Sequence, residues 1–282
     1  MFKVFHEILG DYAEIPEKPK RVVSLYPSVT ESLVQMGISD ELVGVSSHCH
    51  LYVKNLKKVS VSSATEVNYK RLEQIRPDLV LTTTGIQREM AKALHSKGYK
   101  VFPIPVSWSL YGIIANVLLI GALVGREEEA QSLGQRLAGE LEASRVELKQ
   151  EQRPRVYIEL WPNKYSTTMG SLSFINDLVY AAGGCNIFFQ KALAYFTADF
   201  QDVAAANPNI MFFLFGTRRE MKETDIPSLI AKRGWDAVEA RQKGKIVVSL
   251  EGDLPLTDSG PSGIKNVRLL SEKLREFGVL PK

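Results

Sequence analysis

Residues Asn68–Ile104 read NYKRLEQIRPDLVLTTTGIQREMAKALHSKGYKVFPI and alternate between two residue periodicities. Apolar residues recur at helical spacing over Asn68–Ile75 and again over Gln87–Lys97, so each segment is predicted to be a helix. The runs Asp78–Thr83 and Lys100–Ile104 are short and rich in branched or aromatic residues, which is typical of buried strands. Helices of this size between such strands indicate a parallel sheet with helices on both faces.

The same alternation extends toward the N-terminus. Strands are predicted at Arg21–Leu25 and Leu42–Ser46, and the helix between them stops at Gly37. A hairpin that turns at Gly10-Asp11 precedes the first of these strands.

Strands and helices alternate again beyond Pro154, without a close sequence repeat. The predicted strands are Arg155–Leu160, Ile210–Phe215 and Lys245–Leu250. The predicted helices are Ser173–Ala182, Asp199–Ala205, Ile226–Lys232 and Ser262–Phe277. The fold class is therefore α/β, with two lobes built around parallel sheets.

Two helices without strands separate these halves. Tyr111–Val124 is apolar, and Glu127–Glu151 is amphipathic with leucines at helical spacing. The second helix would be about 35 Å long, which suits a strut between two lobes. A surface helix of a single domain is the alternative. The predicted organisation is an N-terminal lobe over residues 1–110, connecting helices over 111–153 and a C-terminal lobe over 154–282.

Composition and motifs exclude several classes of function. The net charge of the 282 residues is +3, and the basic residues are dispersed among acidic ones, so no nucleic-acid partner is expected. The apolar run Ile113–Gly125 is too short for a membrane span, which needs about 20 residues. The turn Tyr26-Pro27-Ser28 after the first buried strand is not a phosphate-binding glycine loop, and no nucleophile elbow or zincin motif occurs. We therefore expect no enzyme.

The start of the chain and its two cysteines bear on the compartment. Residues Met1–Lys20 lack the pattern of a secretory signal. A processed chain would be periplasmic or attached to the cell surface, whereas a native start at Met1 would make the protein cytoplasmic. Cys49 and Cys185 are expected as free thiols, although one disulfide is possible in principle.

The segment Ser46–His50 (SSHCH) is the first candidate site. It follows a strand that should end at the carboxyl edge of the sheet, where open α/β sheets place ligands. In an extended chain His48 and His50 point to the same side, toward one metal or chelate, and Cys49 points inward. The alternative is an exposed loop with Cys49 in the core. A metal site made only of protein needs about four ligands, and the others are not evident.

Two further groups lie at predicted strand ends. Aromatic side chains there suit a large planar ligand, and ordinary packing is the alternative. These aromatics are Trp108, Trp161, Tyr165, Tyr195 and Phe196. The segment Thr82–Gly85 offers hydroxyls and backbone amides directly after a strand, unless it is a plain loop.

At these residues the chain resembles the class III substrate-binding proteins of ABC importers, the family that carries vitamin B12, ferric siderophores and haem. The matching pieces run almost from end to end, and it is their order and spacing that make the resemblance specific. They are Pro16–Glu31, Gly44–Ser47, Asn68–Val80, Gly98–Val101, Arg155–Pro162, Ser173–Gly184, Asn186–Phe188, Gly234-Trp235 and Gly244–Val248.

The resemblance implies two Rossmann-like lobes joined by one long backbone helix, and a ligand held between the lobes. The cobalamin-binding branch is nearest, because its members often have an aromatic residue and a Cys at His48-Cys49 and a Trp-Pro at Trp161-Pro162. The cargo implied is a cobalt or iron chelate, with no intrinsic cofactor. The implied ligand-facing positions are His48, His50, Ala64, Thr65, Thr83, Trp161, Thr167, Tyr195 and Asp253.

This chain departs from the family pattern in two places. The enteric cobalamin binders carry Trp where this chain has Ala64 and Thr83, which leaves room for a different chelate, and a His at position 48 could coordinate cobalt or iron directly. Family members also present one Glu on each lobe to arginines of the permease, whereas the matching positions here are Lys70 and Gln201. Acidic neighbours could replace those glutamates because long-range attraction tolerates a shift of one turn. These neighbours are Glu66, Glu73, Asp199 and Asp202.

The resemblance therefore implies a monomer that serves an ABC permease and its ATPase. The alternative is an intracellular protein that binds a corrinoid or another metal chelate and meets no transporter.

Overall fold

The computed structural model describes residues 1–53 and 55–281, and the contacts within it group the chain into two compact units. Unit 1 comprises Met1–Ser107, Tyr111–Ala138 and Ser259–Pro261. Unit 2 comprises Trp108–Leu110, Gly139–Asp258 and Ser262–Lys282. Each unit contains its own sheet and its own core, so the two are described separately.

Unit 1 is built on a five-stranded parallel sheet with the strand order β5-β4-β3-β6-β7. These strands are β3 (Val22–Ser24), β4 (Leu42–Ser46), β5 (Val59–Ser62), β6 (Leu79–Thr83) and β7 (Val101–Ile104). A separate antiparallel hairpin pairs β1 (Phe2–His6) with β2 (Asp11–Ile15). Strands β3, β6 and β7 are buried throughout, as expected for a parallel sheet covered on both faces.

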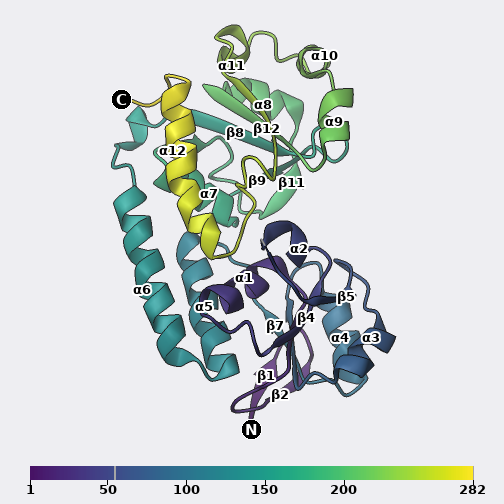
Figure 1. Cartoon of the computed structure of the whole chain (residues 1–282). Coiled ribbons are helices and arrows are strands. Elements are labelled where there is room, and N and C mark those ends of the chain that lie inside the picture. Colours follow the sequence, from purple (N-terminus) through teal and green to yellow (C-terminus); the bar gives the residue numbers. More distant parts are fainter. Residues whose placement is uncertain (54, 282) are drawn as a thin grey trace. The chain divides into compact units, whose positions relative to one another are not determined.

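Helices cover both faces of this sheet (Figure 1). Helices α3 and α4 pack on one face, where Leu72 and Leu94 meet Val23, Val61 and Val80 in a buried cluster. Helices α1 and α5 lie on the other face. The helices of this unit are α1 (Pro27–Gln35), α2 (Cys49–Tyr52), α3 (Tyr69–Ile75), α4 (Arg88–Ser96), most of α5 (Leu110–Val124) and the first part of α6 (Glu127–Ser144).

Unit 2 contains a six-stranded sheet with the path β11-β9-β8-β12-β13, and β10 also pairs with β8. The strands are β8 (Arg155–Leu160), β9 (Thr167–Met169), β10 (Cys185–Asn186), β11 (Tyr195–Thr197), β12 (Ile210–Phe215) and β13 (Ile246–Leu250). Strand β12 is completely buried between β8 and β13, and it runs parallel to both. Strands β9 and β11 are antiparallel additions at one edge, which the expectation of a purely parallel sheet did not include.

An aromatic core lies on one face of this sheet. Tyr157, Phe213 and Phe215 project from the strands onto α8, α10 and α11, and Trp235 stacks edge-on against Tyr157 with ring centroids 5.6 Å apart. Helices α7 and α12 lie on the opposite face (Figure 1). The helices of unit 2 are α7 (Phe174–Ala181), α8 (Phe200–Ala206), α9 (Arg218–Glu223), α10 (Ile226–Lys232), α11 (Glu239–Gln242) and α12 (Asn266–Glu276). Short 3₁₀ turns occupy Gln150–Gln152 and Pro261–Lys265.

The long amphipathic helix is shorter than predicted, because α6 ends at Ser144 and not at Glu151. The backbone N–H of Val146 leaves the helix and donates to the carbonyl of Ala181 at 2.9 Å. The side chain of Val146 also packs directly over Gly183. Eighteen residues give a helix of about 27 Å, and the boundary between the units falls within it, after Ala138.

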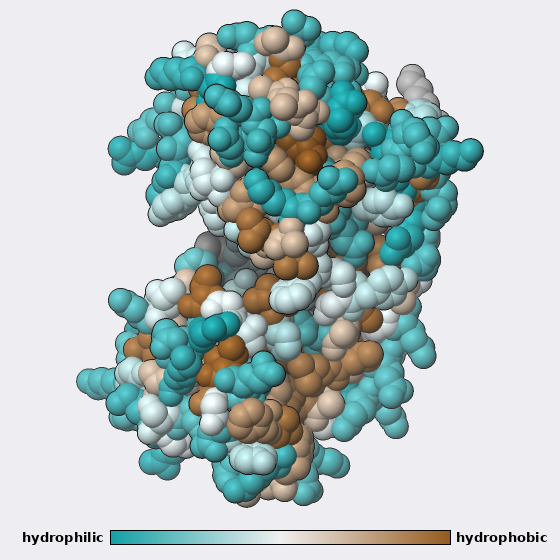
Figure 2. All heavy atoms as spheres, turned by 180° about the vertical axis from the view of Figure 1, so that it is seen from behind, coloured by the Kyte–Doolittle hydropathy of each residue, from teal (hydrophilic) through white to brown (hydrophobic). Residues whose placement is uncertain are grey.

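Most side chains on the surface are polar. Figure 2 shows hydrophilic residues over much of one face, with apolar side chains in small groups among them. In the described part of the chain, no helix has both the length and the apolar character that a membrane crossing requires. Cys49 and Cys185 are both free thiols, as predicted.

Candidate functional site

In unit 1 the predicted ligand residues follow the carboxyl ends of neighbouring parallel strands. His48 and His50 come after β4, Ala64 and Thr65 come after β5, and Thr83 is the last residue of β6. Because β5, β4, β3 and β6 are consecutive in the sheet, their following loops meet at one edge. Both histidines and Thr65 are exposed, Ala64 is half-buried and Thr83 is buried.

The expectation that His48 and His50 point to the same side is wrong. The chain turns after Ser46, and His48 has helical dihedral angles (φ −66°, ψ −31°) at the start of α2. Residues two positions apart in a helical turn point in roughly opposite directions, since each residue rotates by about 100°. No group of three His, Cys, Asp or Glu side chains arranged to hold a metal ion occurs among the described residues. The geometric argument for a shared metal at these histidines is therefore lost.

Cys49 does point inward, as predicted. Its side chain is fully buried, and its Sγ lies 3.0 Å from Oγ1 of Thr30 and 3.2 Å from Oγ of Ser46. Thr30 Oγ1 in turn donates to Ser24 Oγ at 2.7 Å, so the cluster joins the ends of β3 and β4 to α1. Burial raises the pKa of the Cys49 thiol. The thiol thus anchors the loop that carries the two histidines and is not itself accessible.

Gln87 connects three strand ends, a role that was not predicted from the sequence. Its Nε2 donates to the carbonyl of Leu25 at 2.7 Å and to that of Ala64 at 3.0 Å. Its Oε1 accepts from the backbone N–H of Thr83 at 3.2 Å. With only 1% of its surface exposed, Gln87 fixes the loops after β3 and β5 to the end of β6.

A small cavity of about 20 Å³ lies beside Thr83 within unit 1. Tyr26, Ser107 and Asn116 line it together with Ser259 from near the end of the chain. The amide of Asn116 donates to Ser107 Oγ at 2.9 Å and to the Pro105 carbonyl at 2.8 Å, which holds the segment after β7 in place. The cavity has room for about one water molecule, and Thr83 borders it within this unit.

In unit 2 the segment Trp161–Ser166 follows the carboxyl end of β8. Trp161, Asn163 and Ser166 all have positive φ angles, of 49°, 69° and 47°. The Trp161 carbonyl accepts from the backbone N–H groups of Lys164, Tyr165 and Ser166 at 3.1–3.2 Å, so the turn is closed on itself. Non-glycine residues rarely adopt this conformation, and such strain concentrates at functional sites.

Aromatic and acidic side chains surround this segment. Trp161 stacks edge-on against Tyr165, which is exposed, with ring centroids 6.1 Å apart. Burial raises the pKa of Glu251, the residue after β13, and a hydrogen bond with Trp161 opposes that shift. Glu220 adds a nearby negative charge that raises the pKa of Glu251 further. Glu251 thus places a partly desolvated carboxyl group beside the predicted Trp161, and it was not among the residues predicted from the sequence.

The other predicted ligand residues of unit 2 lie on neighbouring elements. Thr167 begins β9 and pairs with Leu160 of β8, directly beside the turn. Tyr195 begins β11, has 44% of its surface exposed, and pairs with Met169. Asp253 is exposed in the segment after β13. Trp108, with 61% of its surface exposed, also belongs to unit 2.

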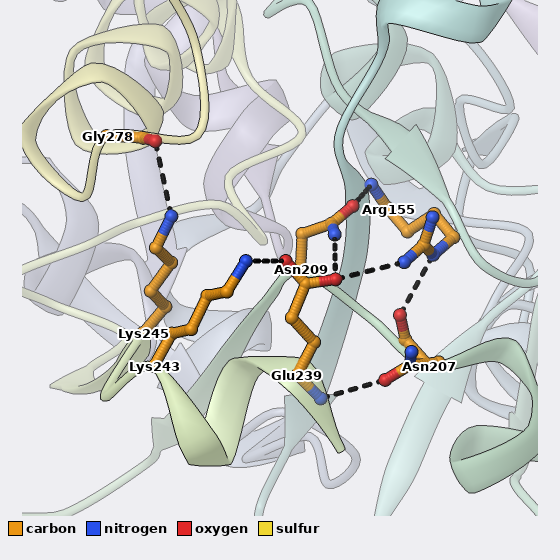
Figure 3. A network of polar contacts seen from close by, with 7 residues as sticks. All are labelled: Arg155, Asn207, Asn209, Glu239, Lys243, Lys245 and Gly278. Atoms are coloured by element: carbon orange, nitrogen blue, oxygen red, sulfur yellow. Dashed lines mark hydrogen bonds and ion pairs between the residues drawn. The ribbon is translucent and has the colours of Figure 1, made fainter.

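The amino edge of the same sheet is closed by internal contacts (Figure 3). Glu239 accepts from Asn209 at 2.7 Å and pairs with Arg155 at 3.3 Å and with Lys243 at 2.7 Å. Asn207 accepts from the Glu239 backbone N–H at 2.8 Å. These polar groups satisfy one another, in contrast to Glu251, whose buried Oε1 has no partner among the described residues.

The predicted docking residues are all exposed. Glu66 follows β5, and Lys70 and Glu73 lie on α3. Gln201 and Asp202 lie in the first turn of α8, which Asp199 caps by accepting from the Gln201 backbone N–H at 2.7 Å. Lys191 Nζ lies 3.5 Å from Asp202, so that acidic charge is partly neutralised.

Comparison with known proteins gives one family and several relatives. The family described as periplasmic binding protein matches residues 22–250. The uncharacterized ABC transporter substrate-binding lipoprotein YvrC of Bacillus subtilis is 26% identical over 266 residues, which cover 92% of this chain and 81% of the relative. The vitamin B12-binding protein of Salmonella paratyphi A is 29% identical over 189 residues, covering 67% and 70%. The structure of the periplasmic vitamin B12-binding protein BtuF of Vibrio cholerae superposes with a TM-score of 0.73 at 21% identity, over 93% of this chain and 99% of that one.

Proposed function

Because the chain belongs to the periplasmic binding protein family, we propose that it binds a metal chelate as the substrate-binding protein of an ABC importer. A corrinoid is the first candidate, because a vitamin B12-binding protein is among the relatives. A ferric siderophore or haem comes next. The protein would hold its cargo without transforming it, so no catalytic role is proposed.

The observation that supports this proposal best is the position of several predicted ligand residues. His48, Thr83 and Trp161 lie at or directly after the carboxyl ends of parallel strands, which is where open α/β sheets bind ligands. Thr167 and Tyr195 begin the neighbouring antiparallel strands β9 and β11. Trp161 and Tyr195 would supply flat apolar contact area at little cost in side-chain entropy. His48, His50, Thr65 and Asp253 are exposed and could donate to or accept from polar groups on the rim of a chelate.

Coordination by one of the two histidines fits this proposal better than coordination by both. Either imidazole could coordinate the central metal of a chelate that already supplies the remaining ligands. That arrangement needs one protein nitrogen, and the opposed directions of His48 and His50 allow it. A free metal ion would need more ligands than this loop provides.

We propose that the transporter contact uses exposed charges on both units. Glu66 and Glu73 in unit 1, with Asp199 and Asp202 in unit 2, would face basic residues of a permease. An exported location follows from this role. An intracellular chelate-binding protein is the alternative, and it rests on Lys70 and Gln201 standing where the family carries glutamates.

The test is a titration of the purified protein with cyanocobalamin, haemin and a ferric siderophore, followed by absorption spectra and thermal melting. A ligand at 100 times its Kd should stabilise the fold by about 2.7 kcal/mol. Tyr195→Ala should weaken binding, whereas Tyr12→Ala, on the exposed face of the N-terminal hairpin, is the matched control. If none of the three chelates changes the spectrum or the melting temperature, the proposed function is wrong.

A further inference from the structure

The turn Trp161–Ser166 is held by a charged pair buried in unit 2. Glu159 on β8 has no exposed side-chain surface, and the side chain of Arg233 is 4% exposed. The guanidinium binds the carboxylate through two hydrogen bonds, from Nη1 to Oε2 at 2.6 Å and from Nη2 to Oε1 at 2.9 Å. Tyr157 donates its hydroxyl to the same carboxylate at 2.7 Å.

Packing fixes the plane of this guanidinium. The Arg233 Cζ lies 4.6 Å from the ring centroid of Phe200 and 4.9 Å from that of Trp235. Trp235 is itself held, because its indole N–H donates to the Phe200 carbonyl at 2.8 Å. The direction of every remaining N–H of Arg233 is therefore determined by the core.

One of those N–H groups reaches the strained turn. Nη2 of Arg233 donates to Oγ of Ser166 at 2.8 Å, and Ser166 has a φ of 47°. A second contact comes from Thr197 on β11, whose hydroxyl donates to the Tyr165 carbonyl at 3.2 Å. Hydrogen bonds thus hold the last two residues of the turn, Tyr165 and Ser166, and the turn begins at Trp161.

An ordinary core would not need this pair. Apolar side chains of similar volume often stabilise a fold as well as a buried ion pair does. What an apolar pair cannot do is donate a hydrogen bond in a fixed direction to Ser166. The strain at Trp161 and Ser166 persists only while the surrounding structure imposes it.

We propose that Arg233, held by Glu159, is a positioning residue that keeps the Trp161–Ser166 turn in its ligand-binding conformation. It would act through Ser166 and would not touch the ligand. The ligand-binding part of this inference rests on the proposed function, because Trp161 and Thr167 flank the turn as candidate ligand contacts. A turn ordered in advance leaves less entropy to be lost when the ligand binds.

Ser166→Gly tests the proposal because it removes the hydroxyl while glycine tolerates the positive φ, so the fold should remain intact. Ser166→Asn is the conservative variant, since Asn also tolerates this conformation and offers an oxygen to Arg233. Asn207→Gly is the matched control. Asn207 also has a positive φ, of 45°, and its side chain also accepts one hydrogen bond, but it lies at the amino edge of the sheet (Figure 3).

Two readouts are needed: hydrogen exchange of residues 161–166 in the ligand-free protein, and the Kd for cyanocobalamin. Ser166→Gly should speed exchange in the turn and raise the Kd about tenfold, the size of one lost charge-assisted hydrogen bond. Ser166→Asn should restore both, and Asn207→Gly should change neither. Unchanged exchange in Ser166→Gly would overturn the positioning role, and faster exchange with an unchanged Kd would overturn its link to binding. If the wild type binds no chelate, the proposed function fails, while the exchange data still decide whether Arg233 orders the turn.

Discussion

Replacing Gln87 with Ala should destabilise unit 1 while leaving unit 2 intact. The change removes the partners of two carbonyl oxygens and one N–H, at Leu25, Ala64 and Thr83. Leu25 and Thr83 are buried, so their groups would lose a hydrogen bond without gaining water, whereas Ala64 is half-buried and water can reach it. Each buried backbone group left without a hydrogen-bond partner costs about 1–2 kcal/mol, and the Ala64 carbonyl costs less. The free energy of unfolding of unit 1 should therefore fall by about 3 kcal/mol.

The assay must separate the two units, and the chain offers a probe for each. All three tryptophans, Trp108, Trp161 and Trp235, belong to unit 2, so fluorescence follows that unit. Cys49 is buried in unit 1, and its reaction with a thiol reagent in a Cys185→Ser background follows the opening of unit 1. A loss of about 3 kcal/mol should lower the urea midpoint for Cys49 exposure by about 1 M, at a slope of about 3 kcal/mol/M.

Gln74→Ala on the exposed surface of α3 is the control, and it should shift neither transition. If Gln87→Ala and Gln74→Ala have the same Cys49 midpoint, the three hydrogen bonds do not stabilise the edge of the sheet. Gln87→Glu adds a test by pH. The new carboxyl group would face two carbonyl oxygens, so its pKa should rise on folding. Its stability should then be highest below the ordinary Glu pKa and fall as the pH rises through the raised value.

Three more outcomes follow from single residues. Burial raises the pKa of Glu251, so its ionisation destabilises the fold as the pH rises above the ordinary Glu value. Glu251→Gln should therefore be more resistant to urea than the wild type at pH 7.5 but not at pH 4.5. An equal difference between the two proteins at both pH values would contradict this. Cys49 is buried and Cys185 is partly exposed, so a thiol reagent should modify one thiol in the native protein and two in denaturant. Rapid modification of both thiols without denaturant would show that unit 1 opens readily. A Cβ at Gly121 in α5 would lie 2.2 Å from Cβ of Ala130 in α6, so Gly121→Ala should destabilise unit 1 by about 3 kcal/mol. Ala130→Gly should recover part of that loss in urea titrations, and a double variant no better than the single one would place the strain elsewhere.

The sequence predicted the buried strands well, because a strand buried on both faces is a continuous apolar run. The bounds of β4, β8 and β12 agree with the prediction at both ends. The short strands β5, β9 and β11 were missed: they have three or four residues each and carry serines or threonines, so they lack that signal. The end of α6 was misplaced because Val146 leaves the helix for a contact with Ala181, 35 positions further on (181 − 146).

The candidate site was predictable only as a set of strand ends. The parallel alternation predicted that the ends of β4 and β6 share one edge of the sheet, which includes Thr83, whereas β5, the strand that leads to Ala64, was missed. Gln87 could not be found, since its partners Leu25 and Ala64 lie 62 and 23 positions away. Glu159 did carry a signal: it is the charge in the part of β8 that is otherwise apolar or aromatic, residues 156–160, and a buried charge needs a partner. The ligand contacts and the lobe boundaries at 110 and 153 stay predictions.

The way the chain is shared between the units has a consequence for the order of synthesis. Unit 1 includes Ser259–Pro261, and Ser259 lines the small cavity beside Thr83. On a ribosome, the 121 positions from Ala138 to Ser259 (259 − 138) take about 6–24 s at about 5–20 residues per second. Throughout that interval the first sheet can form with its Gln87 contacts in place, but its carboxyl edge lacks a residue that arrives only after unit 2 has almost been made. The carboxyl edge of the first sheet therefore stays incomplete until the chain is nearly finished.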